Sequence, residues 1–251
     1  MGRRSLRRYE IRSKPVGEGK QGRVYFGRDA ERRKGVAVKE TFDPAHAEQE
    51  ARAMRSVGPS PYLPAFVDCF LAHGRGYLVT AWISGRPLRD VRAKRKRRVA
   101  VGIALDVLKA LQDVHAAGYL HGDVHVNNVM FAKRNAGRVK LIDLGRALPK
   151  GEDGIYRGKH ERKAPRAFAP PEQRRSGRWT LDDSSDLYKA AGLCVYLMTR
   201  KKPALDPASG GHRCTLKNKK LQSVLNKAMR ADPKERYRSA AEFIRALEPF
   251  A

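Results

Sequence analysis

The residues best suited to do chemistry lie in the stretch His121-Gly122-Asp123-Val124-His125-Val126-Asn127-Asn128 and at Asp143 further along the chain. An apolar run follows Asn128, and a second apolar run ends at Asp143. This pattern predicts a hairpin with Asp123 and Asn128 at its start and Asp143 at its end. Two carboxylates and a carboxamide would then meet at one edge, where such oxygen ligands suit a magnesium ion that also holds phosphate oxygens. An Asp- and Asn-rich turn between two strands is the alternative interpretation.

Two short motifs in this region resemble those of a known family. His-Gly-Asp at 121–123, with Asn128 five residues after the Asp, and Asp-Leu-Gly at 143–145 are similar to the catalytic loop and the metal-binding motif of the eukaryotic-like (Hanks-type) serine/threonine protein kinases. The resemblance implies that Asp123 aligns or deprotonates the attacking hydroxyl, and that Asn128 and Asp143 hold Mg²⁺. It also implies an α+β, two-lobed protein-kinase-like fold, with a small antiparallel sheet and one helix in the first lobe and mainly helices in the second.

Upstream of these motifs, alternating apolar residues predict an antiparallel sheet with strands over residues 9–16, 23–28 and 35–40. The turn Gly17-Glu18-Gly19-Lys20-Gln21-Gly22 joins the first two strands, and its glycines would let the backbone approach phosphates. A simple hairpin turn is the alternative for this segment.

Lys39 lies on the third predicted strand with apolar residues on both sides, so its ammonium group needs an anion nearby. The candidates are a nucleotide phosphate and a glutamate of the next helix, predicted over residues 44–57. Glu50 shares a face of that helix with Met54, and Glu48 is the second candidate. The kinase resemblance implies a Lys39–Glu50 ion pair, whereas two unrelated surface charges are the alternative.

Two further strands, predicted over residues 64–71 and 76–82, complete the first lobe. By resemblance, the second of them leads into a hinge where Thr80 is the gatekeeper and the backbones of Ala81 and Ile83 meet the adenine of ATP. The remaining residues of the implied nucleotide site are Gly17, Glu18, Gly19, Gly22, Val24, Ala37, Lys39 and Met130. The apolar members of this set fit an ordinary core equally well.

The sequence pattern in the second half of the chain predicts helices. An apolar stripe that ends at His115 and is closed by Gly118 predicts an amphipathic helix in which His115 packs as a structural residue. By resemblance, Asp186 ties a later helix to the catalytic loop, and Glu172, in an Ala-Pro-Pro-Glu segment, bonds Arg236.

Length and composition fit one catalytic domain. With 251 residues, 41% of them hydrophobic and 31% charged, the chain can bury a substantial core. We expect a basic N-terminal tail over residues 1–8, an N-lobe over 9–83 and a C-lobe over 84–251. No apolar run approaches the roughly 20 residues that span a bilayer, and three scattered cysteines indicate a reducing, cytoplasmic compartment. A monomer without a membrane partner is the expected form.

The formal net charge of +27 is the extreme feature of the composition. It indicates acidic protein substrates, or contact with nucleic acid or another polyanion, and a well-solvated basic surface is the alternative. The densest basic run covers residues 92–98, where few aromatic residues are interleaved for base stacking. Further cations follow Asp143, at Arg157, Lys159, Arg162, Lys163 and Arg166.

Departures from the family pattern bear on control and on the acceptor. Gly122 replaces the arginine that usually receives a phosphorylated activation loop, and residues 145–168 contain no Ser or Thr. We therefore expect a kinase that activation-loop phosphorylation does not control. His125 replaces a lysine of the Ser/Thr kinases and is closer to the aminoglycoside and choline kinases.

The sequence thus predicts an ATP- and Mg²⁺-dependent kinase that phosphorylates Ser or Thr hydroxyls of proteins. Its expected catalytic residues are Lys39, Glu50, Asp123, Asn128 and Asp143. A small-molecule phosphotransferase of the aminoglycoside and choline kinase kind is one alternative, and a kinase-fold scaffold that binds polyanions is another. The Ala-Pro-Pro-Glu segment and Asp186 favour the protein substrate, because by resemblance they belong to that branch of the family.

Overall fold

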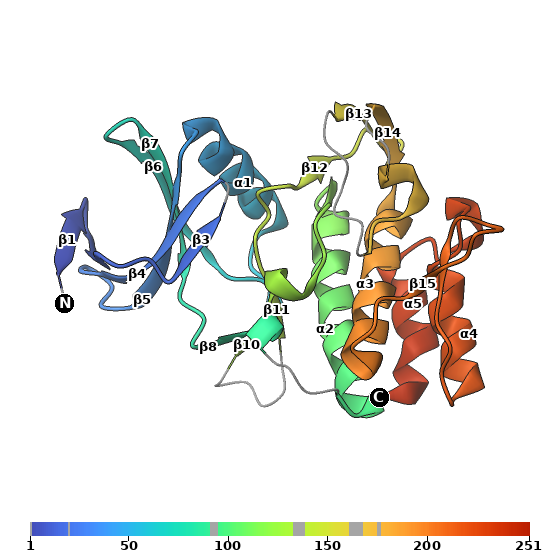
Figure 1. The fold of residues 1–251 in the computed structure, drawn as a ribbon. Coiled ribbons are helices and arrows are strands. Elements are labelled where there is room, and N and C mark those ends of the chain that lie inside the picture. The colour runs from blue at the N-terminus through green and yellow to red at the C-terminus, as the bar shows by residue number, and fades with distance from the viewer. Residues whose placement is uncertain (1, 20, 91–94, 133–138, 161–167, 175–176) are drawn as a thin grey trace.

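A curled antiparallel sheet of seven strands forms the N-terminal lobe of the computed structural model, which describes residues 2–19, 21–90, 95–132, 139–160, 168–174 and 177–251 (Figure 1). The strand order is β1-β2-β4-β5-β7-β6, and β3 pairs with β4. The strands are β1 (Arg3–Leu6), β2 (Tyr9–Arg12), β3 (Gly17–Gly19), β4 (Gly22–Asp29), β5 (Gly35–Thr41), β6 (Phe66–Ala72) and β7 (Arg75–Ala81). With the helical second lobe, this sheet confirms the predicted α+β, two-lobed fold.

The two faces of the sheet have different environments. On β5, Val36 and Val38 are buried in an apolar cluster with Tyr77 of β7, whereas Ala37 and Lys39 are only half-buried. Because successive residues of a strand point to opposite faces, Ala37 and Lys39 lie on the face away from this cluster.

The first residues of the chain belong to this sheet. The sequence predicts a basic tail over residues 1–8, but Arg3–Leu6 pair along their whole length with β2. Leu6 is 7% exposed, and the guanidinium of Arg7 lies 4.2 Å from the ring centre of Phe70 on β6. The prediction of a tail is therefore wrong for residues 3–7, where the rings of Tyr25 and Phe70 on other strands stabilise the side chains of Arg4 and Arg7.

The other strands of the sheet lie where the alternation predicts them, with shifted ends. The strand predicted over residues 9–16 ends at Arg12, and β3 begins at Gly17. Pro15 lies between them and has no N–H to continue a ladder, which accounts for the interruption.

Helix α1 (Pro44–Val57) has the predicted bounds. The side chain of Asp43 caps its N-terminus by accepting the N–H of Ala45, and Gly58 follows its last turn with a φ of 70°. The buried face of α1 carries Glu50 beside Ala51 and Met54. The helix therefore holds a carboxylate in a largely apolar contact surface.

The C-terminal lobe is built on α2 (Arg97–Ala116), α3 (Asp183–Thr199), α4 (Lys219–Ala228) and α5 (Ala240–Leu247). Helices α3 and α5 both pack against α2 (Figure 1). One apolar cluster fills this lobe and also includes Met54 of α1 and Leu78 of β7. The two lobes therefore share a continuous core behind the catalytic residues.

Short strands and 3-10 helices lie in the connections of this lobe. The predicted hairpin is formed by β10 (Val129–Ala132) and β11 (Val139–Leu141), with β8 (Gly85–Pro87) on the outer edge of β10. The remaining strand pairs are β9 (Tyr119–Leu120) with β12 (Leu148–Pro149), β13 (Tyr156–His160) with β14 (Gly177–Leu181), and β15 (Ala204–Leu205) with β16 (His212–Arg213). The 3-10 helices cover Leu88–Asp90, Val126–Asn128, Pro171–Gln173, Pro233–Glu235 and Glu248–Phe250.

Several cations of the basic runs that indicate polyanion contact lie outside the described residues, namely Arg92, Lys94, Arg162, Lys163 and Arg166. Lys20 of the glycine-rich turn does so too. Within the described ranges, no helix is both long enough and apolar enough to cross a membrane.

Candidate active site

Lys39 lies between two carboxylates that are distant in the sequence. Its Nζ is 2.7 Å from Oε2 of Glu50 on α1 and 2.8 Å from Oδ1 of Asp143. The side chains of Lys39 and Glu50 are 17% and 5% exposed, so water screens their ion pair little. Burial of the ammonium group acts against its charge, but the two carboxylates outweigh it and raise the pKa of Lys39. The lysine therefore remains charged at physiological pH, as a site for phosphate oxygens requires.

The Asp143-Leu144-Gly145 turn is fixed to α1 and to Lys39. The N–H of Leu144 donates to Oε1 of Glu50 at 3.1 Å, and the N–H of Gly145 donates to Oδ1 of Asp143 at 3.2 Å. A Cβ at Gly145 would lie only 3.0 to 3.1 Å from Asp143, Glu50 and Lys39 side-chain atoms. These distances are shorter than ordinary contacts, so glycine at this position leaves room for the three charged groups. Burial alone would raise the pKa of Asp143, but Lys39 and the Gly145 N–H hold it below its usual range.

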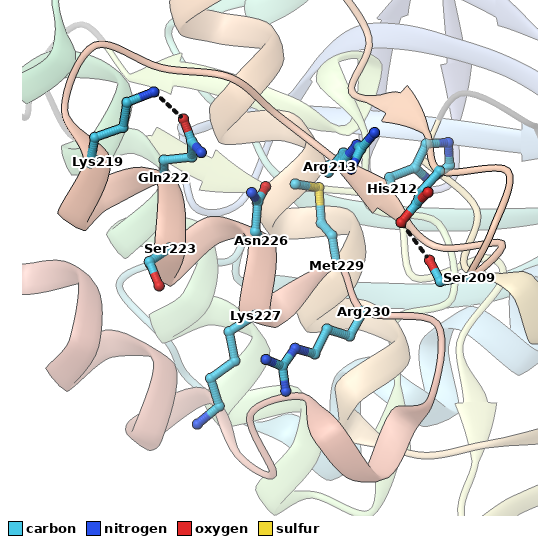
Figure 2. Close-up of a pocket in the computed structure, with 11 residues that line it drawn as sticks. Ser209, His212, Arg213, Lys219, Gln222, Ser223, Asn226, Lys227, Met229 and Arg230 are labelled. Atoms are coloured by element: carbon cyan, nitrogen blue, oxygen red, sulfur yellow. Dashed lines mark hydrogen bonds between the residues drawn. The ribbon is translucent and has the colours of Figure 1, made fainter.

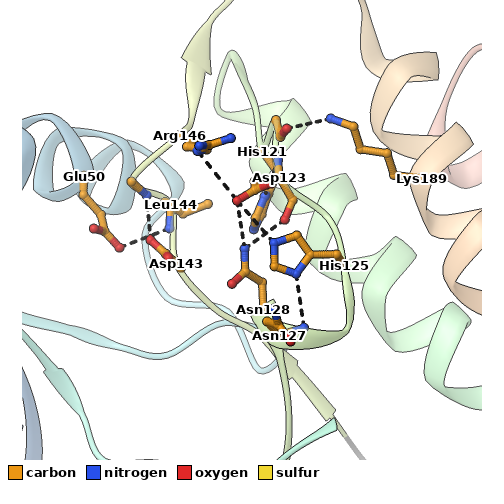
Figure 3. A network of polar contacts seen from close by, with 12 residues as sticks. Glu50, His121, Asp123, His125, Asn127, Asn128, Asp143, Leu144, Arg146 and Lys189 are labelled. Atoms are coloured by element: carbon orange, nitrogen blue, oxygen red, sulfur yellow. Dashed lines mark hydrogen bonds and ion pairs between the residues drawn. The ribbon is translucent and has the colours of Figure 1, made fainter. Parts of the chain in front are cut away.

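The carboxylate of Asp123 lies at the centre of the catalytic loop (Figure 3). Its Oδ2 is 3.4 Å from Nδ2 of Asn128, 3.4 Å from Nε2 of His125 and 3.8 Å from Nε of Arg146. Burial of this carboxyl group would raise the pKa of Asp123, but the hydrogen bond from His125 and the charge of Arg146 lower it overall. Asp123 is therefore ionised at neutral pH and can accept a hydrogen bond from a substrate hydroxyl.

The contact of Nδ1 of His125 decides which ring nitrogen carries the hydrogen that faces Asp123. The N–H of Asn127 donates to Nδ1 of His125 at 3.1 Å. A neutral imidazole that accepts at Nδ1 carries its hydrogen on Nε2, which faces Asp123.

Helix α3 positions the catalytic loop through the side chain of Asp186. Asp186 is fully buried and accepts the N–H groups of His121 at 2.7 Å and Gly122 at 3.0 Å, which confirms the predicted tie between this helix and the loop. His115 of α2 is buried as predicted, and its Nε2 also lies 3.1 Å from Asp186. Despite full burial, these partners hold the pKa of Asp186 well below its ordinary value.

One positioning residue escapes prediction from the sequence. Lys189, one turn after Asp186 on α3, is 4% exposed and donates to the carbonyl oxygen of Gly122 at 2.6 Å. Its spacing of three residues from Asp186 in an apolar helix is the one signal that the sequence carries.

The structure gives a reason for glycine at position 122, where the resembled family usually has an arginine. Its φ is 76°, and a Cβ there would lie 2.7 Å from the carbonyl oxygen of Arg146. A side chain at this position would therefore require both a left-handed conformation and movement of the backbone after the Asp-Leu-Gly turn.

The residues expected to hold Mg²⁺ have donor sets that suit it. Nδ2 of Asn128 donates to the carbonyl oxygen of Asp123 at 2.9 Å, which leaves its amide oxygen as a ligand. Asp143 offers a carboxylate that is 39% exposed. Amide and carboxylate oxygens are ligands that Mg²⁺ accepts together with phosphate oxygens and water.

The residues expected around ATP come from both lobes. Ala37 pairs with Thr80, and Val24 pairs with Lys39, so these four side chains share the face of the sheet that lies away from its buried cluster. Of the glycines, Gly17 and Gly19 lie on β3, and Gly22 begins β4, with Glu18 pairing opposite Arg23.

The hinge residues follow β7. The N–H of Ala81 donates to the carbonyl oxygen of Ala65 at 2.9 Å, so this N–H is not available to a ligand. Ile83 is half-buried beyond the end of β7, and Met130, on β10, is half-buried too.

The predicted contact between Glu172 and Arg236 is confirmed. The guanidinium donates to both carboxylate oxygens, at 2.7 and 3.0 Å, and Arg236 is 2% exposed. Ser185 of α3 donates to the same carboxylate at 2.9 Å. This bidentate pair fixes the segment before α3 to the end of the lobe.

Comparison with known proteins agrees with this geometry. The family model described as the protein kinase domain matches residues 10–248. The chain is 28% identical to the serine/threonine-protein kinase Pkn1 of Myxococcus xanthus, over 93% of this chain and 37% of that protein. It is 28% identical to serine/threonine-protein kinase D of Synechocystis, over 96% of this chain and 52% of that protein. It is 27% identical to PknB of Mycolicibacterium smegmatis, over 94% and 41% of the two chains.

The chain thus spans about a third to a half of the length of these curated relatives. The match to the family model covers nearly all of the chain, and the ion pair of Lys39, the catalytic loop and the Glu172–Arg236 pair lie within it. This chain belongs to the protein kinase family.

Proposed function

We propose that this chain is an ATP- and Mg²⁺-dependent protein kinase that transfers the γ-phosphoryl group to Ser or Thr hydroxyls of proteins. The observation that carries the proposal is the position of Lys39, whose ammonium group lies 2.7 Å from Glu50 and 2.8 Å from Asp143. An ammonium group fixed in this way is ready for the α- and β-phosphates of ATP.

In this proposal each residue of the site has one role in the reaction. The backbone of Gly17, Gly19 and Gly22 covers the phosphates, and Asn128 and Asp143 offer oxygen ligands to Mg²⁺. Mg²⁺ held by these residues would neutralise charge on the phosphates of ATP. Ala81, Ile83 and the apolar side chains on the same face as Ala37 hold the adenine.

The transfer step follows from the position of Asp123. The ionised carboxylate accepts a hydrogen bond from the acceptor hydroxyl and aligns its oxygen with the γ-phosphorus. As the new O–P bond forms, the bond to the β,γ-bridging oxygen breaks and ADP leaves with that electron pair. The hydroxyl proton passes to Asp123 late, because the transition state is loose and positioning supplies most of the acceleration.

We also propose how the kinase is controlled, in which compartment it acts and which substrate charge it prefers. Gly122 stands where the family has an arginine, so activation-loop phosphorylation does not switch the kinase. The enzyme is a cytoplasmic monomer whose net charge of +27 favours acidic proteins and allows nonspecific contact with nucleic acid.

The test is phosphoryl transfer from γ-labelled ATP with Mg²⁺ to casein and to a basic protein, followed by identification of the labelled amino acids. We expect label on Ser or Thr of casein, with less on the basic protein. Label on a polyol such as an aminoglycoside, with none on either protein or on the kinase itself, would contradict the proposal.

A further inference from the structure

An open pocket of about 450 Å³ lies in the C-terminal lobe, and none of the candidate catalytic residues lines it (Figure 2). Its walls come from α4, from the β15–β16 hairpin and from the turn that follows α4. Figure 1 places these elements at the outer side of the lobe, with α3 between them and the sheet of the first lobe. The pocket is therefore separate from the proposed nucleotide site.

The lining of this pocket is strongly basic. Arg213, Lys219, Lys227 and Arg230 line it, and Asp206 is the one carboxylate among its lining residues. A concave surface with an excess of one charge concentrates the field and attracts groups of opposite charge.

Two of these cations lack an ion pair with any other residue that the structure describes, namely Arg213 and Lys219. Lys227 has a partner in Glu242 at 3.1 Å, and Arg230 lies 4.0 Å from Glu235. Neither Glu242 nor Glu235 lines the pocket. An anion in the pocket would thus meet two uncompensated cations and two that are partly compensated.

The wall formed by α4 is fixed in position. The carbonyl oxygen of the Gln222 side chain accepts the N–H of Leu216 at 2.9 Å, which leaves its amide hydrogens as donors. The side chain of Asn226 bonds both backbone groups of Cys214, at 2.8 and 3.3 Å. A preorganised wall lowers the entropic cost of binding a flexible ligand.

We propose that this pocket binds an acidic peptide segment of the protein substrate while the acceptor hydroxyl lies at Asp123. This inference rests on the proposed function. A peptide fits better than nucleic acid, because no Phe, Tyr or Trp side chain lines the pocket to stack a base, and the imidazole of His212 is already bound to Arg174 and Tyr188.

The pocket also lies beside the segment that contains Glu172 and beside its partner Arg236. His212 of the lining lies 3.0 Å from Arg174, which donates to the carbonyl oxygen of Ala169 at 3.0 Å. The carbonyl oxygen of Arg230 accepts a hydrogen bond from Nε of Arg236 at 2.7 Å. A segment bound here is held on the lobe that carries Asp123, which raises the effective concentration of its hydroxyl at the site.

The test compares the charge reversals Arg213→Glu and Lys219→Glu, made together, with Lys217→Glu and Lys220→Glu, made together. Lys217 and Lys220 are exposed neighbours that do not line the pocket, so the two double variants have the same net charge. The probe is a fluorescein-labelled polyglutamate peptide without Ser, Thr or Tyr, and its Kd is measured by anisotropy. The KM and kcat for casein are measured alongside.

The pocket variant should bind the peptide about tenfold more weakly and raise the KM for casein without lowering kcat. The control variant should change either constant by less than about twofold. If the protein with both pocket charges reversed is unstable, the double variant Arg213→Gln and Lys219→Gln replaces it, and a smaller change in the same direction is expected.

Equal loss of peptide binding in both double variants would overturn the proposal, since the effect would then be one of net charge. Tighter binding of a single-stranded oligonucleotide, lost in the pocket variant, would overturn it in favour of nucleic acid. Peptide binding that depends on the pocket, together with no phosphoryl transfer by the wild type, would overturn the proposed function and leave the acidic-peptide site standing.

Discussion

The ammonium group of Lys189 donates to the carbonyl oxygen of Gly122 at 2.6 Å and lies 3.9 Å from Oδ1 of Asp186. Asp186 in turn accepts the N–H of the same glycine. Both backbone groups of Gly122 are therefore bound by one turn of α3, directly before Asp123. The geometry of the catalytic carboxylate thus depends on a buried charged pair of α3.

Replacing Lys189 by Met tests this dependence. The variant keeps the length of the side chain but leaves the Gly122 carbonyl without its donor, so the free energy of unfolding should fall by about 1–3 kcal/mol. The kcat should fall as well, because Asp123 loses its fixed position. Denaturant unfolding and casein phosphorylation measure the two effects. Lys201→Met, at an exposed position just after α3, is the control. An unchanged kcat in the Lys189 variant would contradict the positioning role.

Gly122 and Gly154 offer a matched pair for the backbone argument. Both have a positive φ, of 76° and 75°, but only at Gly122 would a Cβ meet other atoms within 4 Å. Gly154→Ala should therefore cost about 1–2 kcal/mol of unfolding free energy, from the left-handed conformation alone. Gly122→Ala should cost more and should reduce phosphoryl transfer. Thermal unfolding with equal losses at the two positions would show that the approach of Arg146 does not matter.

The Glu172–Arg236 pair should be strongly coupled. Because Arg236 is 2% exposed, Glu172→Gln leaves a buried guanidinium without its counter-ion, which costs about 3–5 kcal/mol. A double-mutant cycle that adds Arg236→Met should recover part of this loss. Denaturant unfolding of the four proteins supplies the coupling energy, and strictly additive losses would count against the pair.

The lowered pKa of His212 should make the free energy of unfolding depend on pH. Burial, and then the charge of Arg174, lower the pKa of His212 to about 4 in the folded protein, whereas an unfolded histidine titrates near its usual value of about 6.5. The unfolded state then binds more protons between these values, so stability falls as pH decreases from about 6.5 to 4. His212→Gln should flatten this part of the profile and leave the slope above pH 7 unchanged. A profile of the variant that runs parallel to the wild type would contradict the assignment.

The sequence predicts those parts of the site where periodicity and local spacing decide the position. Glu50 was predictable because it shares a helical face with Met54, and the structure brings it to Lys39. Asp123 and Asn128 were predictable as neighbours because only four residues separate them in one turn.

The sequence fails where the partner is remote or is a backbone group. Arg4 and Arg7 suggest a tail, yet they lie 4.7 and 4.2 Å from the rings of Tyr25 and Phe70, on other strands. Lys189 cannot be predicted from the sequence, because its partner is a carbonyl group 67 residues away, which no side-chain pattern reveals.

The most direct test of the central claim is the kcat of Asp123→Asn for casein, with ATP affinity measured on the same protein. Asn keeps the shape and the hydrogen bonds of the side chain but cannot take the proton. We predict a kcat lower by about 10²–10⁴-fold at unchanged affinity for Mg²⁺-ATP. A variant that transfers phosphate as fast as the wild type would contradict the proposed role of Asp123 and, with it, the proposed mechanism.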